Sequence, residues 1–393
     1  MQISMLRPVG SRVPNPVSGA PSESLSWDER YHTEFVDSGT SALSLAIALS
    51  IAANDLGETP EVILPAYGCP DLVSAVLFQG AKPVLVDLGN SSPCLSLGAL
   101  KQALTDNTVA VIAVDLLGFH ENLEGIKAVL DGTGVWLIED SAQAFPPSSS
   151  GSGIADCIVL SFGRGKPINL MGGGALLIRR DRTQSAKAIL QSLPKRRIST
   201  GATWRSKRFI FNLLLSRLFY GLLARIPFLG FGKTEFVPLG SITSLEIPPV
   251  LIRAGVSSYH KRAYFAGLYL ESLAFLEDHG WSGPRELTKA CVECSDSDPL
   301  PRLLRFPLLA PSVEIRDQAV FELQQAGICA NSLYGAPLPG IRGLQSFFGR
   351  YASDFPNARA FSRHLILLPL HEDVRRHDIE HAAKILKSIS APN

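Results

Sequence analysis

The chain has 393 residues, of which 46% are hydrophobic and 19% are charged. This composition excludes a disordered protein, because enough apolar surface is present to offset the entropy lost when the chain is ordered. The formal net charge of +1 argues against a globally basic nucleic-acid-binding protein, so we expect no nucleic-acid partner. The length is sufficient for two domains.

The first part of the chain has the pattern of an α/β domain. Residues 1–35 are rich in Pro, Ser and Gly and are expected to form an irregular N-terminal arm, and residues 38–53 begin with small capping residues and continue as an apolar helix. Short apolar runs typical of buried strands follow at 62–66, 83–88, 109–117, 135–140, 157–162 and 174–179. Helical stretches separate the earlier runs, which predicts a mostly parallel sheet covered on both faces.

The chain changes character after about residue 182. Residues 182–234 contain eleven Lys/Arg and no Asp or Glu, together with many aromatic residues. Two helical patterns follow, at 250–278 and 313–326. Short apolar strands are expected at 302–309 and 364–370, and a last helix at 377–389. We therefore expect a large α/β domain over residues 36–245, with the basic apolar insertion at 182–234, and a smaller C-terminal α+β domain over residues 246–393.

Cysteine usage and the absence of targeting signals indicate a cytoplasmic protein. The six cysteines are scattered along the chain at positions 69, 94, 157, 291, 294 and 329, which favours a reducing compartment. Cys291 and Cys294 form a lone CxxC, and without further ligands this pair predicts no zinc site. The N-terminus lacks the apolar core of a signal peptide, and the run from Phe209 to Leu223 is too short to cross a bilayer.

Three groups of polar residues fall where parallel sheets bind ligands, at strand ends and helix starts. Ser38, Gly39, Thr40 and Ser41 open the first apolar helix, where free N–H groups favour a phosphate. The alternative is an ordinary helix cap. Asp140 ends a buried strand, where a carboxylate needs a cationic partner. The alternative is that Asp140 only caps the next helix.

Lys166 lies in the glycine-rich loop SFGRGKPINLMGGG, between two apolar strands. Glycine allows the backbone to pass close to a ligand, and a lysine in an enclosed site can act as a Schiff-base nucleophile. Taken alone, this residue could equally be a surface-loop lysine. Together, however, the three features suit pyridoxal 5′-phosphate, because they follow one another along the chain as a phosphate-binding helix start, a strand-end Asp and a Ser-x4-Lys loop. This cofactor needs a phosphate site, an acid beside its pyridine nitrogen and an amine.

The same residues resemble the DegT/DnrJ/EryC1/StrS family of pyridoxal-phosphate enzymes, which are mostly nucleotide-sugar aminotransferases of fold type I. The similarity extends from about Phe35 to the C-terminal helix and includes FVDSGTSALSLAI, VILPAYGCPDLVSAVLF, VWLIEDSAQAFP, SFGRGK and HLILLPLHED. It implies that Asp140 contacts the pyridine nitrogen, that Gln143 contacts the ring hydroxyl and that Ser161 binds the phosphate. Lys166 would hold the cofactor covalently. Gly39, Thr40, Ser41 and Cys69 complete the implied cofactor site.

Some features depart from the family pattern. Cys69 stands where the family often has an aromatic residue that stacks on the cofactor ring, with Tyr67 two residues earlier. Many members have an acid in the glycine motif after the lysine loop, whereas this chain has Met171 followed by three glycines. The family segment that reaches the neighbouring subunit's phosphate is not recognisable in residues 239–247. These differences indicate a divergent member.

The resemblance implies an aminotransferase, and a homodimer as its assembly. It would transfer an amino group, with glutamate as the expected donor, to a keto group of a nucleotide-linked sugar for cell-surface polysaccharide or related biosynthesis. Lys166 argues against the sugar dehydrases of the family, in which His replaces this lysine. Two alternatives stay open: another pyridoxal-phosphate reaction, and a non-catalytic regulatory or interaction role on the same scaffold.

Residues 182–234 permit three interpretations. They could form a helix buried in the chain or in a dimer interface, where the basic side chains meet acidic ones. They could also lie on an anionic membrane at its inner face, with apolar side chains inward and Lys/Arg at the headgroups. The third interpretation is a basic entrance for a phosphate-linked substrate, because Arg pairs well with phosphate.

Overall fold

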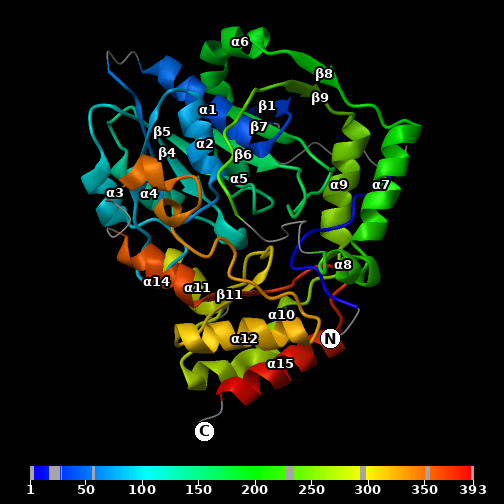
Figure 1. The fold of residues 1–393 in the computed structure, drawn as a ribbon. Helices are drawn as coiled ribbons and strands as arrows, with labels where there is room; N and C mark the ends of the chain where they lie inside the picture. Colours follow the sequence, from blue (N-terminus) through cyan, green and yellow to red (C-terminus); the bar gives the residue numbers. More distant parts are fainter. Residues whose placement is uncertain are drawn as a thin grey trace.

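The computed structural model describes residues 4–16, 27, 29–54, 58–226, 234–292, 298–349 and 355–390. Figure 1 shows a large sheet with helices on its faces, and a second group of helices below it that includes α10, α12 and α15. We refer to the described residues up to Lys261 as the sheet region, and to those from Ala266 onward as the C-terminal region.

A nine-stranded sheet with the strand order β3-β2-β4-β5-β6-β7-β1-β9-β8 forms the centre of the sheet region. Its strands are β1 (Tyr31–Val36), β2 (Glu61–Pro65), β3 (Lys82–Val86), β4 (Thr108–Val114), β5 (Trp136–Asp140), β6 (Cys157–Ser161), β7 (Gly174–Arg179), β8 (Lys195–Arg197) and β9 (Ser244–Glu246). The neighbours from β3 to β6 pair in parallel, whereas β7 is antiparallel to both β6 and β1. The predicted mostly parallel sheet is therefore confirmed.

Alternation along the buried strands explains why helices cover both faces of the sheet. On β4, Ala110 and Ile112 pack into one apolar cluster, and Val111 and Ala113 pack into another. The first cluster includes α1 (Gly39–Ala53) and α2 (Asp71–Phe78). The second includes α3 (Leu97–Ala103), α4 (Leu123–Val129) and α9 (Pro249–Lys261). Strands that are buried on both faces read as continuous apolar runs, which is why all six predicted strands are present.

Two elements lie differently from the sequence expectation. β1 covers Tyr31–Val36, inside the segment expected to be an irregular arm, and its mixed sequence YHTEFV carries no clear strand signal. The helix α9 begins just after the boundary predicted at residue 245. It packs against the sheet region, because Leu251 and Tyr259 share an apolar cluster with Phe145 and the Tyr259 hydroxyl donates to the Phe145 carbonyl (2.7 Å).

The C-terminal region contains a two-stranded antiparallel sheet of β10 (Phe306–Leu309) and β11 (Leu365–Leu368). Its helices are α10 (Ala266–Leu273), α11 (Pro284–Cys291), α12 (Val313–Gln325), α13 (Gln345–Phe348), α14 (Pro356–His364) and α15 (Arg376–Ser390). The predicted short strands and the last helix are present. Buried side chains such as Tyr269 and Leu323 belong to the same cluster that covers one face of the large sheet.

Three further helices connect β7 to β9: α6 (Thr183–Ser192), α7 (Ala202–Leu214) and α8 (Arg217–Leu223). No described side chain of α7 is buried, and Gly221 is the one buried residue of α8. The first interpretation of residues 182–234 offered a helix buried inside the chain or in a dimer interface. The first of these two possibilities is wrong for α7 and α8. Residues 227–233, which include Phe228 and Phe231, lie outside the described part. No helix among the described residues is long and apolar enough to cross a membrane.

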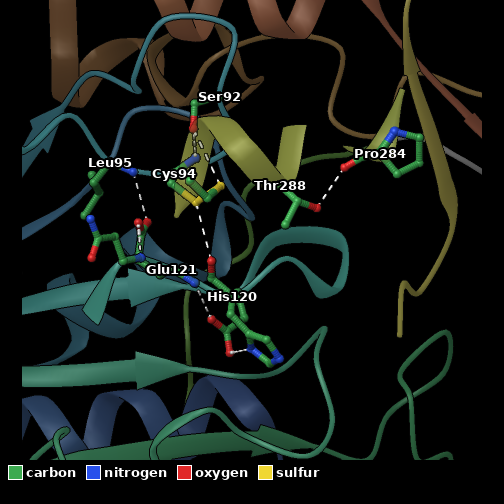
Figure 2. Close-up of a disulfide and its surroundings, with 10 residues drawn as sticks. Ser92, Cys94, Leu95, His120, Glu121, Pro284 and Thr288 are labelled. Carbon is green, nitrogen blue, oxygen red and sulfur yellow. Dashed lines mark hydrogen bonds and ion pairs between the residues drawn. A yellow bond between two sulfur atoms is a disulfide. The ribbon is translucent and has the colours of Figure 1, made fainter. Parts of the chain in front are cut away.

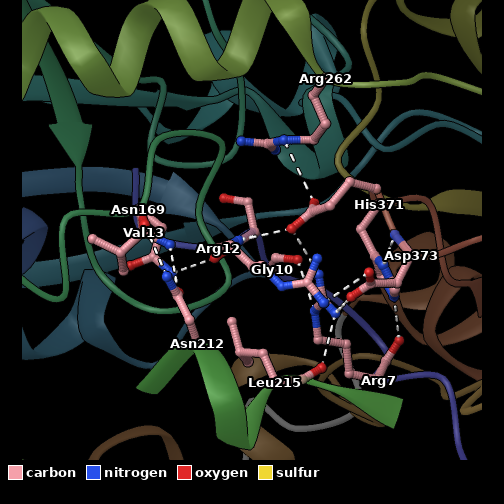
Figure 3. A network of polar contacts seen from close by, with 12 residues as sticks. Arg7, Gly10, Arg12, Val13, Asn169, Asn212, Leu215, Arg262, His371 and Asp373 are labelled. Carbon is pink, nitrogen blue, oxygen red and sulfur yellow. Dashed lines mark hydrogen bonds and ion pairs between the residues drawn. The ribbon is translucent and has the colours of Figure 1, made fainter. Parts of the chain in front are cut away.

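The N-terminal arm runs between the sheet region and the C-terminal region (Figure 3). Arg7 is almost fully buried, and its guanidinium forms ion pairs with Glu372 (3.0 Å) and Asp373. Further along the arm, the Val13 N–H donates to Asn212 of α7 (2.8 Å), and Asn169 of the lysine loop donates to the Ser11 carbonyl (2.6 Å). These contacts fix the arm against three segments that are distant in the sequence.

A disulfide joins Cys94, which lies before α3, to Cys291 at the end of α11 (Figure 2). The two Cα atoms are 5.5 Å apart, and 197 positions separate the residues in the chain. The expectation that the scattered cysteines stay reduced is therefore wrong for this pair, because folding brings together residues whose spacing carries no pairing signal. Cys69, Cys157 and Cys329 are free thiols, and Cys294 lies outside the described residues.

Candidate active site

The candidate site lies at the edge of the sheet where the parallel strands end. Asp140 is the last residue of β5, and Ser161 is the last residue of β6. The helix α1 begins at Gly39, directly after β1, and Cys69 lies in the turn between β2 and α2. The carboxyl ends of adjacent strands in one sheet meet at one edge, so residues from five segments face a single space.

A cavity of about 190 Å³ occupies this space. Six of the eight residues that the sequence singled out line it, namely Gly39, Thr40, Cys69, Asp140, Ser161 and Lys166. Ser38, which the sequence placed at the helix start, and Gly172 and Gly173 of the glycine-rich loop also line it. Asp37 and Asp71 line it as well, and the motifs did not indicate them. Asp71 could have been found, because it is the first residue of a helix that follows a buried strand.

Asp140 and Lys166 are the two charged residues at the centre of the predicted chemistry. Asp140 is buried, and burial raises the pKa of its carboxyl group to about 6, although the nearby Lys166 opposes this shift. One carboxylate oxygen of Asp140 accepts a hydrogen bond from the Ala142 N–H (3.0 Å). Among the described residues, the Lys166 ammonium has no hydrogen bond and no ion pair. The site therefore presents a poorly solvated acid and a free amine to the same cavity.

The start of α1 and the end of β6 form a close backbone cradle. A Cβ atom on Gly39 would lie 2.8 Å from the Ser161 Cβ and 3.0 Å from its Oγ, so no side chain fits at position 39. A Cβ on Gly174 would lie 2.5 Å from the Ser38 carbonyl oxygen. The first N–H groups of a helix have no partner within the helix, and the Ser161 hydroxyl lies beside them. This arrangement can bind an anion such as a phosphate.

Ser41 and Gln143 do not line the cavity. The Ser41 N–H donates to the Ser38 hydroxyl (2.9 Å), and the two hydroxyls lie 2.8 Å apart, so Ser41 serves the helix cap. The Gln143 side chain accepts from the Leu117 N–H (3.2 Å) and donates to the Tyr334 hydroxyl (3.0 Å). The structure thus places Ser38, rather than Ser41, at the cavity wall.

The ring-stacking position holds a thiol. Cys69 lines the cavity, and burial raises the pKa of its thiol to about 12, so the neutral form faces the site. Tyr67 does not compensate for the missing aromatic ring. It is buried away from the cavity, where its ring packs edge-on against Tyr334 (5.6 Å between ring centroids) and Phe361 (5.4 Å).

A larger cavity of about 630 Å³ lies beside the lysine loop. It is lined by the arm, by Arg164 and Gly165 of the loop, by α7 and α8, and by residues 331–334 of the C-terminal region. Phe211, Leu214 and Tyr220 form part of its apolar wall. The insertion therefore contributes apolar and aromatic side chains to the wall of a cavity adjacent to the first one, and none of its Lys or Arg residues is among the described lining residues. The third interpretation, a basic entrance for the substrate, stays a prediction.

A sequence model of the DegT/DnrJ/EryC1/StrS aminotransferase family matches residues 29–218, which include the whole wall of the smaller cavity. The match covers just under half of the chain, and over this segment the chain is similar to that family, as the sequence motifs imply.

Curated members of the family align with part of this chain. An Acidithiobacillus ferrooxidans protein, UDP-N-acetyl-3-dehydro-alpha-D-glucosamine 3-aminotransferase, is 33% identical over 147 residues, which cover 37% of this chain and 39% of that protein. GDP-perosamine synthase of Escherichia coli O157:H7 is 32% identical over 162 residues, which cover 39% and 43% of the two chains. The alignments thus span about two fifths of these relatives.

Two solved structures share the fold over most of the chain. Helicobacter pylori PseC, an aminotransferase involved in pseudaminic acid biosynthesis, has a TM-score of 0.65 at 14% identity, and the match covers 98% of this chain and 99% of that one. Bacillus subtilis NtdA with bound cofactor PMP has a TM-score of 0.65 at 18% identity, covering 92% of this chain and 74% of that one. These similarities establish the predicted fold.

Proposed function

We propose that the protein is a pyridoxal-phosphate-dependent aminotransferase. The observation that carries this proposal is the single cavity in which Lys166, Asp140 and the Gly39–Ser161 cradle meet. A free amine, a buried acid and an anion-binding helix start are the three groups that this cofactor requires. The match of residues 29–218 to an aminotransferase family supports the same reaction class.

The residues present fit pyridoxal 5′-phosphate. Lys166 would hold it covalently, Ser161 and the N–H groups at the start of α1 would bind its phosphate, and Asp140 would contact the pyridine nitrogen. Cys69 would lie against the ring. The contact of Gln143 with the ring hydroxyl stays a prediction from the resemblance, since its side chain is bonded to Leu117 and Tyr334 and does not line the cavity. The raised pKa of Asp140 supports this assignment, since a buried carboxyl without a full counter-charge is stabilised by a cationic nitrogen.

When bound, the cofactor supplies an electron sink for negative charge that develops on the substrate carbon. The Lys166 amine would then move a proton as a general acid and base, which typically contributes roughly 10²- to 10⁴-fold in rate. Asp140 would keep the pyridine nitrogen protonated. The backbone cradle around Gly39 would hold the phosphate and so fix the position of the reacting centre relative to Lys166.

For the substrates, we propose glutamate as the amino donor and a nucleotide-linked keto-sugar as the acceptor, in polysaccharide or related biosynthesis. The names of the relatives support a sugar substrate, since one name contains UDP-N-acetyl-3-dehydro-alpha-D-glucosamine and another contains GDP-perosamine. The larger cavity beside Arg164 and Gly165 offers space for such an acceptor. Incubation with glutamate and a panel of keto-sugar nucleotides, with the product mass as readout, tests this assignment.

We further propose that the protein is a homodimer, as the family resemblance implies. Light scattering on the purified protein tests this assembly, and a monomer at micromolar concentration contradicts it. We also retain the prediction of a cytoplasmic protein that binds weakly to the inner face of the membrane through residues 182–234.

The membrane proposal is supported by the surface of α7 and α8. Phe209, Ile210, Leu218 and Leu222 of this surface are exposed, Phe209 by 67%. Exposed Lys and Arg side chains flank them, as expected for a helix that lies at anionic headgroups. We expect flotation with anionic liposomes at low salt, and neither with neutral liposomes nor at high salt. No flotation at low salt would rule out the membrane contact.

Borohydride reduction tests the cofactor assignment most directly. The protein purified with pyridoxal phosphate should be yellow, and reduction should fix the cofactor to the peptide that contains Lys166. Labelling of another lysine, or no uptake of the cofactor, would contradict the proposal. Lys166→Ala is the matched control, which should show no covalent labelling.

A further inference from the structure

The larger cavity carries positive charge that no acidic residue in its wall balances. Three arginines, Arg7, Arg164 and Arg305, line it, and the described lining residues include no Asp or Glu. Such a cavity favours an anionic ligand. The three guanidinium groups differ, however, in the partners that they already have.

Two of these arginines are already engaged or exposed. Arg7 is paired with Glu372 and Asp373, and it also donates to the carbonyls of Gly10 (3.0 Å) and Leu215 (3.0 Å). It therefore holds the arm in place (Figure 3). Arg164 is exposed, and its guanidinium lies over the ring of Phe211, 5.5 Å from the centroid. Neither residue presents an unsatisfied, desolvated cation to the cavity.

Arg305 is different. It lies immediately before β10, and its Nη1 donates to the Asn331 side-chain oxygen (2.9 Å). Its Nε is buried and has no hydrogen-bond partner, and among the described residues the guanidinium has no ion pair. Burial lowers the pKa of Arg305 to about 10, which reflects the cost of holding this cation without a counter-charge. A ligand that supplied the counter-charge would remove this cost.

A short series of contacts connects Arg305 to the cofactor cavity. Tyr334 lines the larger cavity together with Arg305, and its hydroxyl accepts the hydrogen bond from Gln143. Gln143 follows β5 by three residues, next to the lining residue Ala142 of the smaller cavity. Arg305 and Tyr334 belong to the C-terminal region, whereas Arg164 and Gly165 of the same wall belong to the lysine loop.

We propose that Arg305 binds an oxyanion of the substrate in the larger cavity. A guanidinium forms charge-assisted hydrogen bonds with carboxylate or phosphate oxygens, and Arg305 is a lining residue of this cavity whose charge no described carboxylate balances. The inference rests on the proposed function, which offers two sources of this group: the carboxylate of the amino donor and a phosphate of the sugar acceptor. Both have the chemistry that Arg305 recognises.

Binding of two simple probes tests the proposal without turnover. Glutarate represents the carboxylate and inorganic phosphate represents the phosphate, and calorimetry measures the affinity of each for the purified protein. Arg305→Gln should lower the affinity for at least one probe roughly 10- to 100-fold, the range of a charge-assisted hydrogen bond. The proposal is wrong if the wild-type protein binds neither probe, or if the variant binds both as the wild type does.

Arg302→Gln is the matched control. This residue lies three positions earlier on the same segment, donates to the Arg262 carbonyl (2.9 Å) and stacks over Tyr259, outside the larger cavity. Its substitution should leave both affinities within about twofold. An equal loss in Arg302→Gln and Arg305→Gln would contradict a specific role for Arg305.

A second variant separates binding from folding. Asn331→Asp places a carboxylate at the position that already accepts from Arg305, so an internal ion pair would compete with the ligand while Arg305 remains. It should weaken probe binding in the same direction as Arg305→Gln. Arg305→Lys keeps the charge but loses the planar fork, and should give an intermediate loss. Unchanged affinity in Asn331→Asp would contradict the proposal.

Steady-state kinetics distinguish the two sources of the oxyanion. A raised KM for the donor alone assigns Arg305 to the donor carboxylate, and a raised KM for the acceptor alone assigns it to the acceptor phosphate. Unchanged KM values for both overturn the proposal. Failure of the proposed function would show differently, as absence of borohydride labelling at Lys166, whereas probe binding is measured independently of that reaction.

Discussion

The smaller cavity is lined by residues between Asp37 and Gly173, whereas the larger cavity is lined by residues from Arg7 to Tyr334. The first is formed by successive strand ends and helix starts of one sheet. The second is formed where the arm, the lysine loop, α7, α8 and the C-terminal region meet. The difference indicates that the smaller cavity depends on the sheet region alone, while the larger cavity depends on how separate segments pack together.

The largest effect that we expect concerns the smaller cavity. Asp140→Asn removes a preorganised charge, which typically costs about 3–4 kcal/mol, or roughly 100- to 1,000-fold in rate. We expect this loss in kcat with every acceptor, because the residue serves the cofactor and not one substrate. Asp181→Asn, at an exposed residue two positions after the end of β7, is the control and should keep activity within twofold. Activity of Asp140→Asn within tenfold of wild type would show that Asp140 is only a helix cap.

Removal of the disulfide tests whether the smaller cavity depends on the link between the sheet region and the C-terminal region. Cys94→Ser removes the link between the sheet region and α11, and we expect a loss of about 2–4 kcal/mol in the free energy of unfolding. The affinity for pyridoxal phosphate should stay within about threefold, because the smaller cavity lies within the sheet region. Denaturant unfolding and a cofactor titration measure the two quantities.

The matched variants for this test are Cys291→Ser and the double substitution. If the disulfide is present, both single variants and the double variant should lose the same stability, because each removes the same bond. Additive losses would contradict the disulfide. Thiol titration of the denatured protein should find two more thiols after reduction in the wild type than in the double variant, because the Cys94–Cys291 bond is the source of this pair.

The pKa of Asp140 predicts a pH dependence that is confined to the smaller cavity. Because burial raises the pKa of this carboxyl from 3.8 to about 6 in the folded state, the folded protein without cofactor binds more protons than the unfolded chain between about pH 4 and 6. The contribution of Asp140 to the stability should therefore fall as the pH rises through this window, by up to roughly 3 kcal/mol.

Asp140→Asn checks this sign. The variant without cofactor should be more stable than the wild type above pH 6, and the difference should disappear below pH 4, where the wild-type carboxyl is protonated in both states. Thermal or denaturant unfolding at a series of pH values measures the difference. Parallel stability curves for the two proteins would contradict the assigned pKa.

The smallest effect is expected on the outer surface of α7. Phe209 is 67% exposed, so Phe209→Ser should change the free energy of unfolding by no more than about 0.5 kcal/mol. Unfolding at two protein concentrations measures this value. A loss above about 1 kcal/mol that grows with concentration would show that a second copy of the chain covers this surface.

Sequence reasoning found most of the smaller cavity and little of the larger one. Six of eight predicted residues line the smaller cavity, because motifs after consecutive strands converge at one edge of a parallel sheet. Ser41 and Gln143 are the exceptions, since side-chain direction at a helix start or in a turn depends on local hydrogen bonds. Tyr67 belongs to an aromatic cluster with Tyr334 and Phe361, which no pattern near position 67 could indicate.

The sequence alone determined the strands of the parallel sheet, the helix start at Gly39 and the order of Asp140 and Lys166, because apolar runs and capping residues act within a few positions of the chain. Only the tertiary structure decided the position of β1, the Cys94–Cys291 disulfide and the cavity around Arg305. These features join residues that are far apart in the sequence. Their contacts depend on how the arm, the insertion and the C-terminal region pack against the sheet, and side-chain packing of this kind leaves no periodic signal in the sequence.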